Sequence, residues 1–192
     1  MAEEMIIGIA GTIGAGKGTV VEYLKSKGFI SYSSSKLLGE LVEKDGNPRT
    51  RNFLSPMATR LQKEYPGGVV EKNYREKYLL EKTERTIFEA IHRQSEANFL
   101  RTVGGVIIGV DADLETRYNR TKLRNEGEKD QKSLEDFKEQ SRIEDEGGGD
   151  VSRDNNIREV INNADIVLTN NGTQEELFAQ IEKALQGTKE AD

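Results

Sequence analysis

Between residues 11 and 19 the sequence reads Gly11-Thr12-Ile13-Gly14-Ala15-Gly16-Lys17-Gly18-Thr19. This is the spacing G-x-x-x-x-G-K, in which a lysine follows the last glycine of a short turn. Glycines let backbone N–H groups converge on phosphate oxygens without Cβ clashes, and the lysine adds a mobile cation for the β- and γ-phosphates. The pattern predicts a nucleotide-phosphate loop formed by Gly11, Gly14, Ala15, Gly16, Lys17, Gly18 and Thr19.

The segments on both sides of this loop are those that such a motif requires. Residues 5–10 form a continuous apolar run, which predicts a fully buried strand. From Lys17 to about Ser26 the spacing of the apolar residues predicts a helix. The N-terminus of that helix would add its partial positive charge to the loop.

The alternation of strand and helix continues along the chain. We expect further strands at residues 29–32, 86–89, 106–110 and 166–168, with helical patterns between them. Strands that alternate with helices imply a parallel sheet covered on both faces. The sequence therefore predicts an α/β protein with a three-layer α/β/α P-loop NTPase fold and a five-stranded parallel sheet.

The chain is expected to form a single domain, because 192 residues suit one core. The core is expected at about residues 1–32, 84–120 and 156–192. Two segments, about 33–83 and 121–155, lack buried strands and are polar and helical. They are the natural candidates for inserted segments that lie over a substrate site.

Composition limits the classes of partner. The net charge of −6 argues against extended nucleic-acid binding, which depends on neutralising many phosphates. There is no cysteine, so disulfides, a thiolate nucleophile and a Cys-based zinc site are excluded. The apolar run at residues 5–10 is too short to cross a membrane and has no basic flank for export, so a cytoplasmic protein without membrane contact is expected.

The loop form G-x-x-G-x-G-K-G-T resembles that of adenylate kinases and related nucleoside monophosphate kinases. Transport ATPases and GTPases instead keep Ser or Thr directly after the lysine, where this chain has Gly18. The resemblance implies that ATP and Mg²⁺ bind here and that the Thr19 hydroxyl meets the metal. It also implies that residues 33–83 form the acceptor-binding insertion and residues 121–155 the lid.

Glu89 and Arg93 extend the resemblance. Glu89 ends an expected strand at the edge where ligands bind, so its carboxylate can hold Mg²⁺. Arg93 follows at the spacing of the family's D-G-x-P-R segment, although Glu replaces Asp, and the Gly and Pro are missing. The resemblance implies that Arg93 grips the acceptor phosphate. The alternative is that Glu89 only ends a strand and Arg93 is solvated.

Three arginines, Arg117, Arg120 and Arg124, share one face of an expected helix. The pair Arg120-x-x-x-Arg124 resembles the entry to the kinase lid. The resemblance implies that Arg120 packs on adenine, that Arg124 contacts the transferring phosphate, and that Arg142 on the next helix is a further clamp. A solvated, charged helix is the alternative.

The tail after the last strand, Asn170-Asn171-Gly172-Thr173, resembles that of dephospho-CoA kinases. The resemblance implies that backbone groups of Asn171 and Gly172 touch the adenine. An ordinary turn that caps the last helix explains the same residues.

The acceptor segment begins Ser33-Ser34-Ser35-Lys36-Leu37-Leu38, which has no aspartate to activate a hydroxyl acceptor. A phosphate acceptor needs no strong base, because it is already anionic near neutral pH. The resemblance therefore favours a Mg-ATP-dependent phosphotransferase acting on a small phosphate-bearing molecule, a nucleoside or deoxynucleoside monophosphate, with Arg49, Arg51 and Arg60 as further candidates for gripping it.

Two other functions stay open, a dephospho-CoA kinase-like enzyme and a nucleotide-dependent switch or assembly factor with slow ATPase activity. The sequence leaves undecided the acceptor, the preference for ribose or deoxyribose, and the oligomeric state. It also leaves undecided whether His92, Asp111 or Glu40 takes part in chemistry.

Overall fold

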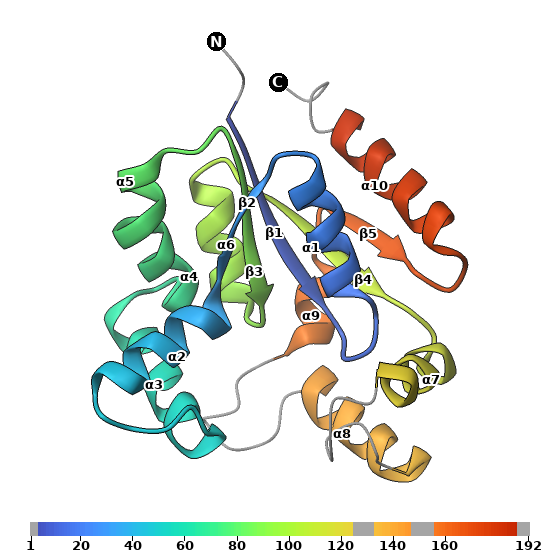
Figure 1. The fold of residues 1–192 in the computed structure, drawn as a ribbon, viewed down its shortest axis with the longest axis horizontal. Coiled ribbons are helices and arrows are strands. Elements are labelled where there is room, and N and C mark those ends of the chain that lie inside the picture. Colours follow the sequence, from blue (N-terminus) through green and yellow to red (C-terminus); the bar gives the residue numbers. More distant parts are fainter. Residues whose placement is uncertain (1–3, 125–132, 147–155, 188–192) are drawn as a thin grey trace.

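A computed structural model of the chain describes residues 4–124, 133–146 and 156–187. Within these residues a parallel sheet has five strands in the order β2-β3-β1-β4-β5 (Figure 1). The strands are β1 (Met5–Gly11), β2 (Ile30–Ser33), β3 (Arg85–Ile91), β4 (Val106–Asp111) and β5 (Ile166–Thr169). This confirms the predicted fold class and each predicted strand.

The helices connect these strands and cover the sheet. Their bounds are α1 (Lys17–Ser26), α2 (Ser34–Lys44), α3 (Arg51–Glu64), α4 (Gly68–Asn73), α5 (Leu79–Glu81), α6 (Gln94–Thr102), α7 (Leu114–Arg124), α8 (Leu134–Glu146), α9 (Ile157–Asn162) and α10 (Gln174–Gly187). A π-helical turn, Tyr74–Tyr78, joins α4 to α5.

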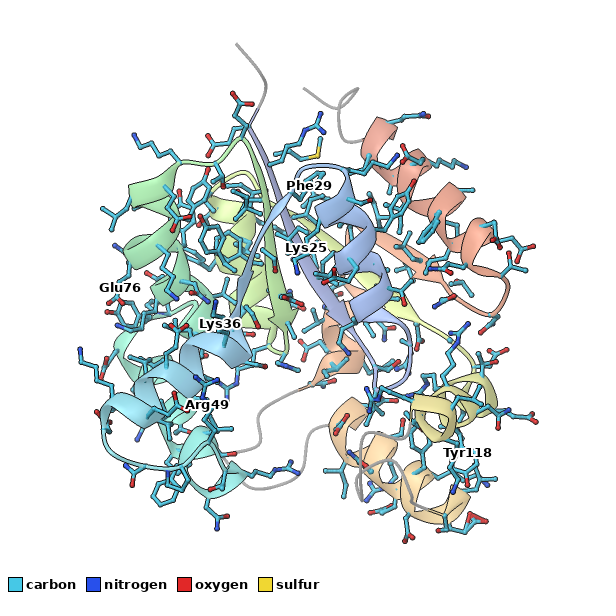
Figure 2. All side chains as sticks on the ribbon, viewed as in Figure 1. Lys25, Phe29, Lys36, Arg49, Glu76 and Tyr118 are labelled. Carbon is cyan, nitrogen blue, oxygen red and sulfur yellow. The ribbon has the colours of Figure 1, made fainter. Side chains whose placement is uncertain are left out.

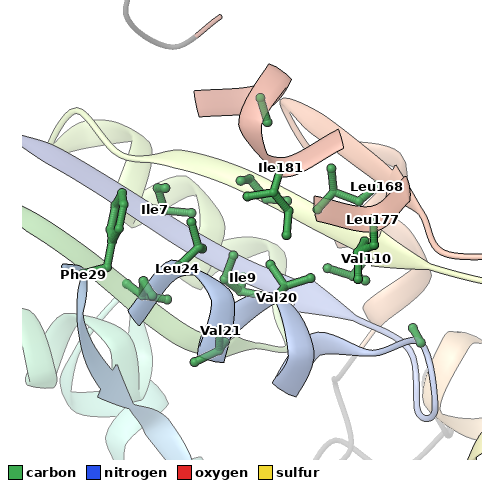
Figure 3. Packing of buried hydrophobic residues seen from close by; sticks show 14 residues of the cluster. Ile7, Ile9, Val20, Val21, Leu24, Phe29, Val110, Leu168, Leu177 and Ile181 are labelled. Carbon is green, nitrogen blue, oxygen red and sulfur yellow. The ribbon is translucent and has the colours of Figure 1, made fainter. Parts of the chain in front are cut away.

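One face of the sheet is covered by α1 and α10. Figure 3 shows Ile7 and Ile9 of β1 against Val20 and Leu24 of α1, with Ile181 of α10 close by. Because successive strand residues point to opposite faces, Ile6 of the same strand packs on the other side. There the cover comes from α4, the π-helical turn, α6 and α9, whose apolar residues include Val70, Tyr78, Leu100 and Val160.

Helices α2, α3, α7 and α8 lie beyond the carboxyl ends of the strands (Figure 1). In Figure 1, α2 and α3 stand on one side of this edge, and α7 and α8 stand on the other. A small separate core of Leu37, Leu61 and Val69 joins α2, α3 and α4. Phe53 of α3 is 40% exposed, whereas Met57 and Leu61 of the same helix are buried.

Two short helices, α6 and α9, were not predicted. Helix α6 buries only Ala97 and Leu100 among its apolar residues, and α9 has only six residues. Neither segment is long or apolar enough for its apolar residues to repeat at the spacing of a helix. Both matter for the site, because their first residues lie at the carboxyl edge of the sheet. No helix in the described ranges is long and apolar enough to cross a membrane.

Candidate functional site

The glycine-rich loop has a geometry that only glycine supplies at two positions. Gly14 has φ of 76° and Gly16 has φ of 99°, both in the left-handed region. A Cβ at Gly14 would lie 2.5 Å from the carbonyl oxygen of Arg117, and one at Gly16 would lie 2.4 Å from Nδ2 of Asn170. The loop is therefore packed tightly between α7 and the segment after β5.

A Gly16→Ala variant should lose nucleotide binding at least tenfold and about 1–3 kcal/mol of unfolding free energy, because the new Cβ forces both a strained backbone and a displaced Asn170. Isothermal titration with Mg-ADP and urea unfolding measure the two effects. Gly187→Ala is the matched control, since a Cβ there meets no atom of the described chain within 4 Å. Unchanged ADP affinity in Gly16→Ala would contradict the loop's assignment.

The loop borders a cavity of about 460 Å³. The cavity is lined by Thr12, Gly14, Gly16, Lys17, Gly18, Thr19, Arg120, Thr121 and Arg124. The structure thus brings Arg120 and Arg124, separated from the loop by about a hundred residues of sequence, to the same cavity as Lys17. This is the arrangement expected for the phosphates of a nucleotide between the loop and α7.

Lys17 is the lysine of the glycine-rich loop and shares this cavity with Arg120 and Arg124. Its Nζ donates to the carbonyl oxygens of Gly11 and Thr12, at 2.7 and 3.0 Å. Burial lowers the pKa of Lys17; the negative charge of Glu144 on α8 opposes this shift, and Arg124 adds to it. An anionic ligand would relieve this burial cost, since it favours the charged form of the lysine.

Arg120 is held by the loop that follows β5. Its guanidinium donates to the backbone oxygen of Asn170 at 2.7 Å and to the Asn170 side chain at 3.3 Å. The Nδ2 of Asn170 donates in turn to the carbonyl of Ala15, at 2.8 Å. Asn171 and Gly172 lie exposed beside it, and Oδ1 of Asn171 accepts from the backbone N–H of Asp113 at 2.8 Å.

Sequence reasoning missed the role of Asn170 as the link between Arg120 and the glycine-rich loop. Its signal was present, because an amide side chain directly follows a strand at the ligand-binding edge.

The residues present offer some of the oxygen ligands of a Mg²⁺ site, but not a full set. Thr19 lines the cavity, and Glu89 lies at the carboxyl end of β3, where Oε1 accepts from Ser31 Oγ at 2.8 Å. Glu89 also acts electrostatically on Lys17. No group of three or more His, Cys, Asp or Glu side chains placed to hold a metal ion occurs within the described residues. Mg²⁺ takes much of its coordination from nucleotide phosphates and water.

A second cavity, of about 240 Å³, lies between α2, α3 and the start of α6. Its lining is apolar on one side and polar on the other, with Ser34, Ser35, Leu38, Leu54, Ser55, Ala58, Val69, His92, Arg93 and Glu96. Arg93 also borders a neighbouring cavity of about 380 Å³ that includes Gln62, Lys63 and Asn156.

Arg93 is buried, with 9% of its surface exposed. One guanidinium nitrogen donates to Gln62 Oε1 at 3.2 Å, and the Nε has no hydrogen-bond partner in the part of the chain that the structure describes. The solvated arginine considered as an alternative is therefore not what the structure contains. A buried cation with an unused donor is suited to an anionic ligand.

His92 and Glu96 flank Arg93. Burial lowers the pKa of His92 to about 4, and the charges of Lys17 and Arg93 add to the shift. Burial raises the pKa of Glu96 to about 7, although its Oε2 accepts from the backbone N–H groups of His92 and Arg93, at 2.9 and 3.2 Å. Ala10 of β1 pairs with Ile91 of β3, so the glycine-rich loop and the segment that begins at His92 follow neighbouring strands, and the second cavity lies next to the loop. Glu96 was not foreseen from the sequence.

The stability contributions of Glu96 and His92 should depend on pH in opposite directions. The pKa of Glu96 rises from 4.5 to about 7, so its contribution is full below pH 4.5 and is lost as pH rises through 7. The pKa of His92 falls from 6.5 to about 4, so its contribution is full above pH 6.5 and is lost as pH falls through 4. Each contribution is on the order of 2 kcal/mol.

Urea unfolding across this range tests the two groups separately. Glu96→Gln should leave an unfolding free energy that increases with pH between 4 and 6.5, whereas His92→Asn should leave one that decreases between 4.5 and 7. Identical pH profiles for both variants and the unmodified chain would contradict the shifts.

Other expected residues lie apart from the two cavities. Arg49 pairs with Glu43 at 2.6 Å, and Figure 2 shows it beside α2, far from Tyr118 on α7. Arg60 pairs with Asp45 and Glu64, and Arg51 is exposed.

Three further residues do not line these cavities, although one of them, Asp111, contacts Thr12, which does. Arg142 contacts Glu139 of its own helix at 2.8 and 2.9 Å, so its role as a clamp stays a prediction. Glu40 accepts from Lys77, and Asp111 accepts from Thr12 and Arg158.

Comparison with known proteins identifies the family. A family model described as "AAA domain" matches residues 7–147. A UPF0200 protein of Sulfurisphaera tokodaii is 31% identical over 183 residues, which cover 94% of this chain and 96% of the relative. The chain belongs to both families. Another member of the UPF0200 family, TK1334 of Thermococcus kodakarensis, is 28% identical, with 93% of this chain and 95% of the relative covered.

Solved structures show the same fold for this member of the UPF0200 family. Shikimate kinase from Aquifex aeolicus has a TM-score of 0.55 at 16% identity, covering 98% of this chain and 100% of that one. Dephospho-CoA kinase from Campylobacter jejuni also has a TM-score of 0.55 at 16% identity, covering 96% and 97%. The protein therefore has the fold of P-loop kinases, and that fold implies nucleotide binding.

Proposed function

We propose that the protein is an ATP- and Mg²⁺-dependent phosphotransferase that moves the γ-phosphate of ATP to a small phosphate-bearing acceptor, a nucleoside or deoxynucleoside monophosphate. The observation that carries this proposal is the pair of neighbouring cavities, one at Lys17 and one at the buried Arg93. A P-loop ATPase needs the first cavity alone. A kinase needs a second, enclosed place for its acceptor.

The chemistry of the second cavity supports an anionic acceptor. Arg93 offers an unpaired, buried N–H, and serines from α2 and α3 offer hydroxyl groups. Oε2 of its acid, Glu96, is occupied by two backbone donors. A phosphate monoester needs no base to activate it, because it is already anionic near neutral pH. The apolar wall of Leu38, Leu54, Ala58 and Val69 suits a nucleobase or another flat organic group.

Each residue then has a role in positioning and charge neutralisation. The phosphates of ATP lie on Gly11, Gly14–Thr19 and their backbone N–H groups, and Lys17 contacts the β- and γ-phosphates. Thr19 and Glu89 hold Mg²⁺, which would neutralise charge on the phosphates. Arg120, Asn171 and Gly172 surround the adenine, and Arg93 grips the acceptor phosphate.

Arg124 and Arg142 stabilise the transferring group, and the proposal needs no covalent enzyme intermediate. In this assignment residues 33–83 are the acceptor-binding insertion and residues 121–155 the lid, of which 125–132 and 147–155 lie outside the described residues. The rest of the chain forms the core.

The deciding experiment measures ADP release from Mg-ATP with a panel of ribo- and deoxyribonucleoside monophosphates. Strong stimulation by one acceptor supports the proposal and names the substrate. Slow hydrolysis that is indifferent to every acceptor would contradict it and favour a nucleotide-dependent switch.

Dephospho-CoA kinase activity is a second candidate. Its support is the Asn170–Thr173 tail and the fold shared with the Campylobacter jejuni enzyme. Dephospho-CoA therefore belongs in the same panel, and stimulation by it alone would replace the first proposal.

A further inference from the structure

A network of charged side chains connects α8 to the glycine-rich loop. Arg158, in the first turn of α9, donates one nitrogen to Asp145 Oδ2 on α8 at 3.0 Å and another to Asp111 Oδ2 at the end of β4. The other oxygen of Asp111 accepts from the hydroxyl of Thr12 at 2.9 Å. A single guanidinium thus spans the distance between α8 and a residue that holds the loop.

Asp145 has a second cation beside it. A nitrogen of Arg117 on α7 lies 3.9 Å from Asp145 Oδ2. Arg117 is itself fixed, because its Nε donates to Ala112 O at 3.0 Å and another nitrogen donates to Ser141 Oγ at 2.8 Å. Two arginines and two aspartates therefore balance one another where α7, α8, α9 and β4 meet.

This network is more enclosed than an ordinary surface pair. The side chains of Arg117 and Asp145 are 4% and 16% exposed, and those of Asp111 and Arg158 are 23% and 36% exposed. Exposed ion pairs contribute little to stability, but removing one partner from an enclosed pair leaves a desolvated charge behind. Loss of Arg158 would leave two carboxylates facing the space that it occupied.

We propose that Arg158 is a positioning residue that ties α8 to the glycine-rich loop through Asp145 and Asp111, and so holds Thr12, whose carbonyl accepts from Lys17 Nζ. The planar, forked guanidinium suits this task because it addresses two carboxylates at once, which the single ammonium of a lysine does less well. This role depends on the loop and on α8, not on which acceptor the protein uses. It therefore stands apart from the proposed function.

Hydrogen exchange of the α8 amides in the full-length protein tests the link directly. Arg158→Gln and Asp145→Asn should each speed exchange about tenfold. The double variant should exchange far less than about a hundredfold faster, because both changes break the Arg158–Asp145 contact, although Asp145→Asn also removes the contact with Arg117. Arg158→Lys should fall between. Lys138→Gln is the control, since Lys138 lies exposed on the same helix and pairs with Glu135. Unchanged exchange in Arg158→Gln, or effects that add in the double variant, would overturn the proposal.

Calorimetric titration with Mg-ADP tests the second half, because Thr12 lines the nucleotide cavity and its carbonyl accepts from Lys17 Nζ. Arg158→Gln should lower ADP affinity, Arg158→Lys should recover part of it, and Lys138→Gln should leave it unchanged. Faster exchange in Arg158→Gln with an unchanged ADP affinity would mean that the link does not reach the loop, and would overturn that part. Should Arg158→Gln fail to fold, Arg158→Lys and Asp145→Asn carry both measurements.

Discussion

A Lys17→Ala variant should lose phosphoryl transfer by at least about 10²- to 10³-fold while keeping its fold. Lys17 is the cation of the loop, and its Nζ is already held at the cavity edge by the carbonyls of Gly11 and Thr12. A preorganised charge at the transferring phosphate acts in the transition state, where removal of one such group has an effect of this size. Burial already disfavours the charged form of this lysine, so its removal should not unfold the chain.

The measurement is ADP release in the presence of the acceptor found by the panel, with circular dichroism and thermal unfolding as checks on the fold. Lys25→Ala is the matched control. Lys25 is on the same helix, is exposed, and pairs with Glu22 at 2.8 Å (Figure 2). Retained transfer in Lys17→Ala would mean that the nucleotide is not bound at this loop.

The strands and the loop were predictable because their signals are local. The run Met5–Ala10 is apolar without interruption since β1 is buried on both faces. In the loop after it, Gly14 and Gly16 must be glycines because of their positive φ and their close neighbours. A short stretch of consecutive residues therefore indicates both the burial of a central strand and the backbone geometry of the loop. The parallel sheet followed from the alternation of such strands with helices.

The arginines show where local reasoning stops. Arg117, Arg120 and Arg124 share a helical face, but their partners differ, since Arg117 contacts Ser141 and Asp145, Arg120 contacts Asn170, and Arg124 borders the loop cavity. These partners come from α8, from the segment after β5 and from the loop. A helical period indicates that side chains share a direction and cannot indicate what lies opposite.

The acceptor site was the least predictable part. Its polar residues come from α2, α3 and the start of α6, and the sequence offered Arg49 and Arg60, which pair instead with Glu43 and Asp45. Whether an arginine has a nearby carboxylate or an empty cavity depends on tertiary packing. The burial of Arg93 also depends on tertiary packing, and so do the hydrogen bonds that Glu96 accepts from two backbone N–H groups.

An Arg93→Ala variant should raise the KM for the acceptor about 10²-fold or more and leave the affinity for Mg-ADP within about twofold. The guanidinium is buried with its Nε unpaired, so an acceptor phosphate would gain a charge-assisted hydrogen bond that no water competes for. The nucleotide cavity does not include Arg93, which is why ADP binding should stay the same. Acceptor kinetics and calorimetry with Mg-ADP give the two numbers.

Arg93→Lys and Arg101→Ala sharpen this test. A lysine keeps the positive charge but lacks the forked N–H donors of the guanidinium, so Arg93→Lys should bind the acceptor more tightly than Arg93→Ala and less tightly than the unmodified chain. Arg101 lies on the same helix, α6, is partly exposed, and pairs with Asp165, so its removal should leave acceptor kinetics unchanged. A fall in acceptor and nucleotide affinity by the same factor in Arg93→Ala would point to a general loosening of the edge of the sheet. An unchanged acceptor KM would place the acceptor elsewhere, because a buried guanidinium whose Nε–H bonds a bound anion cannot be removed without loss of affinity.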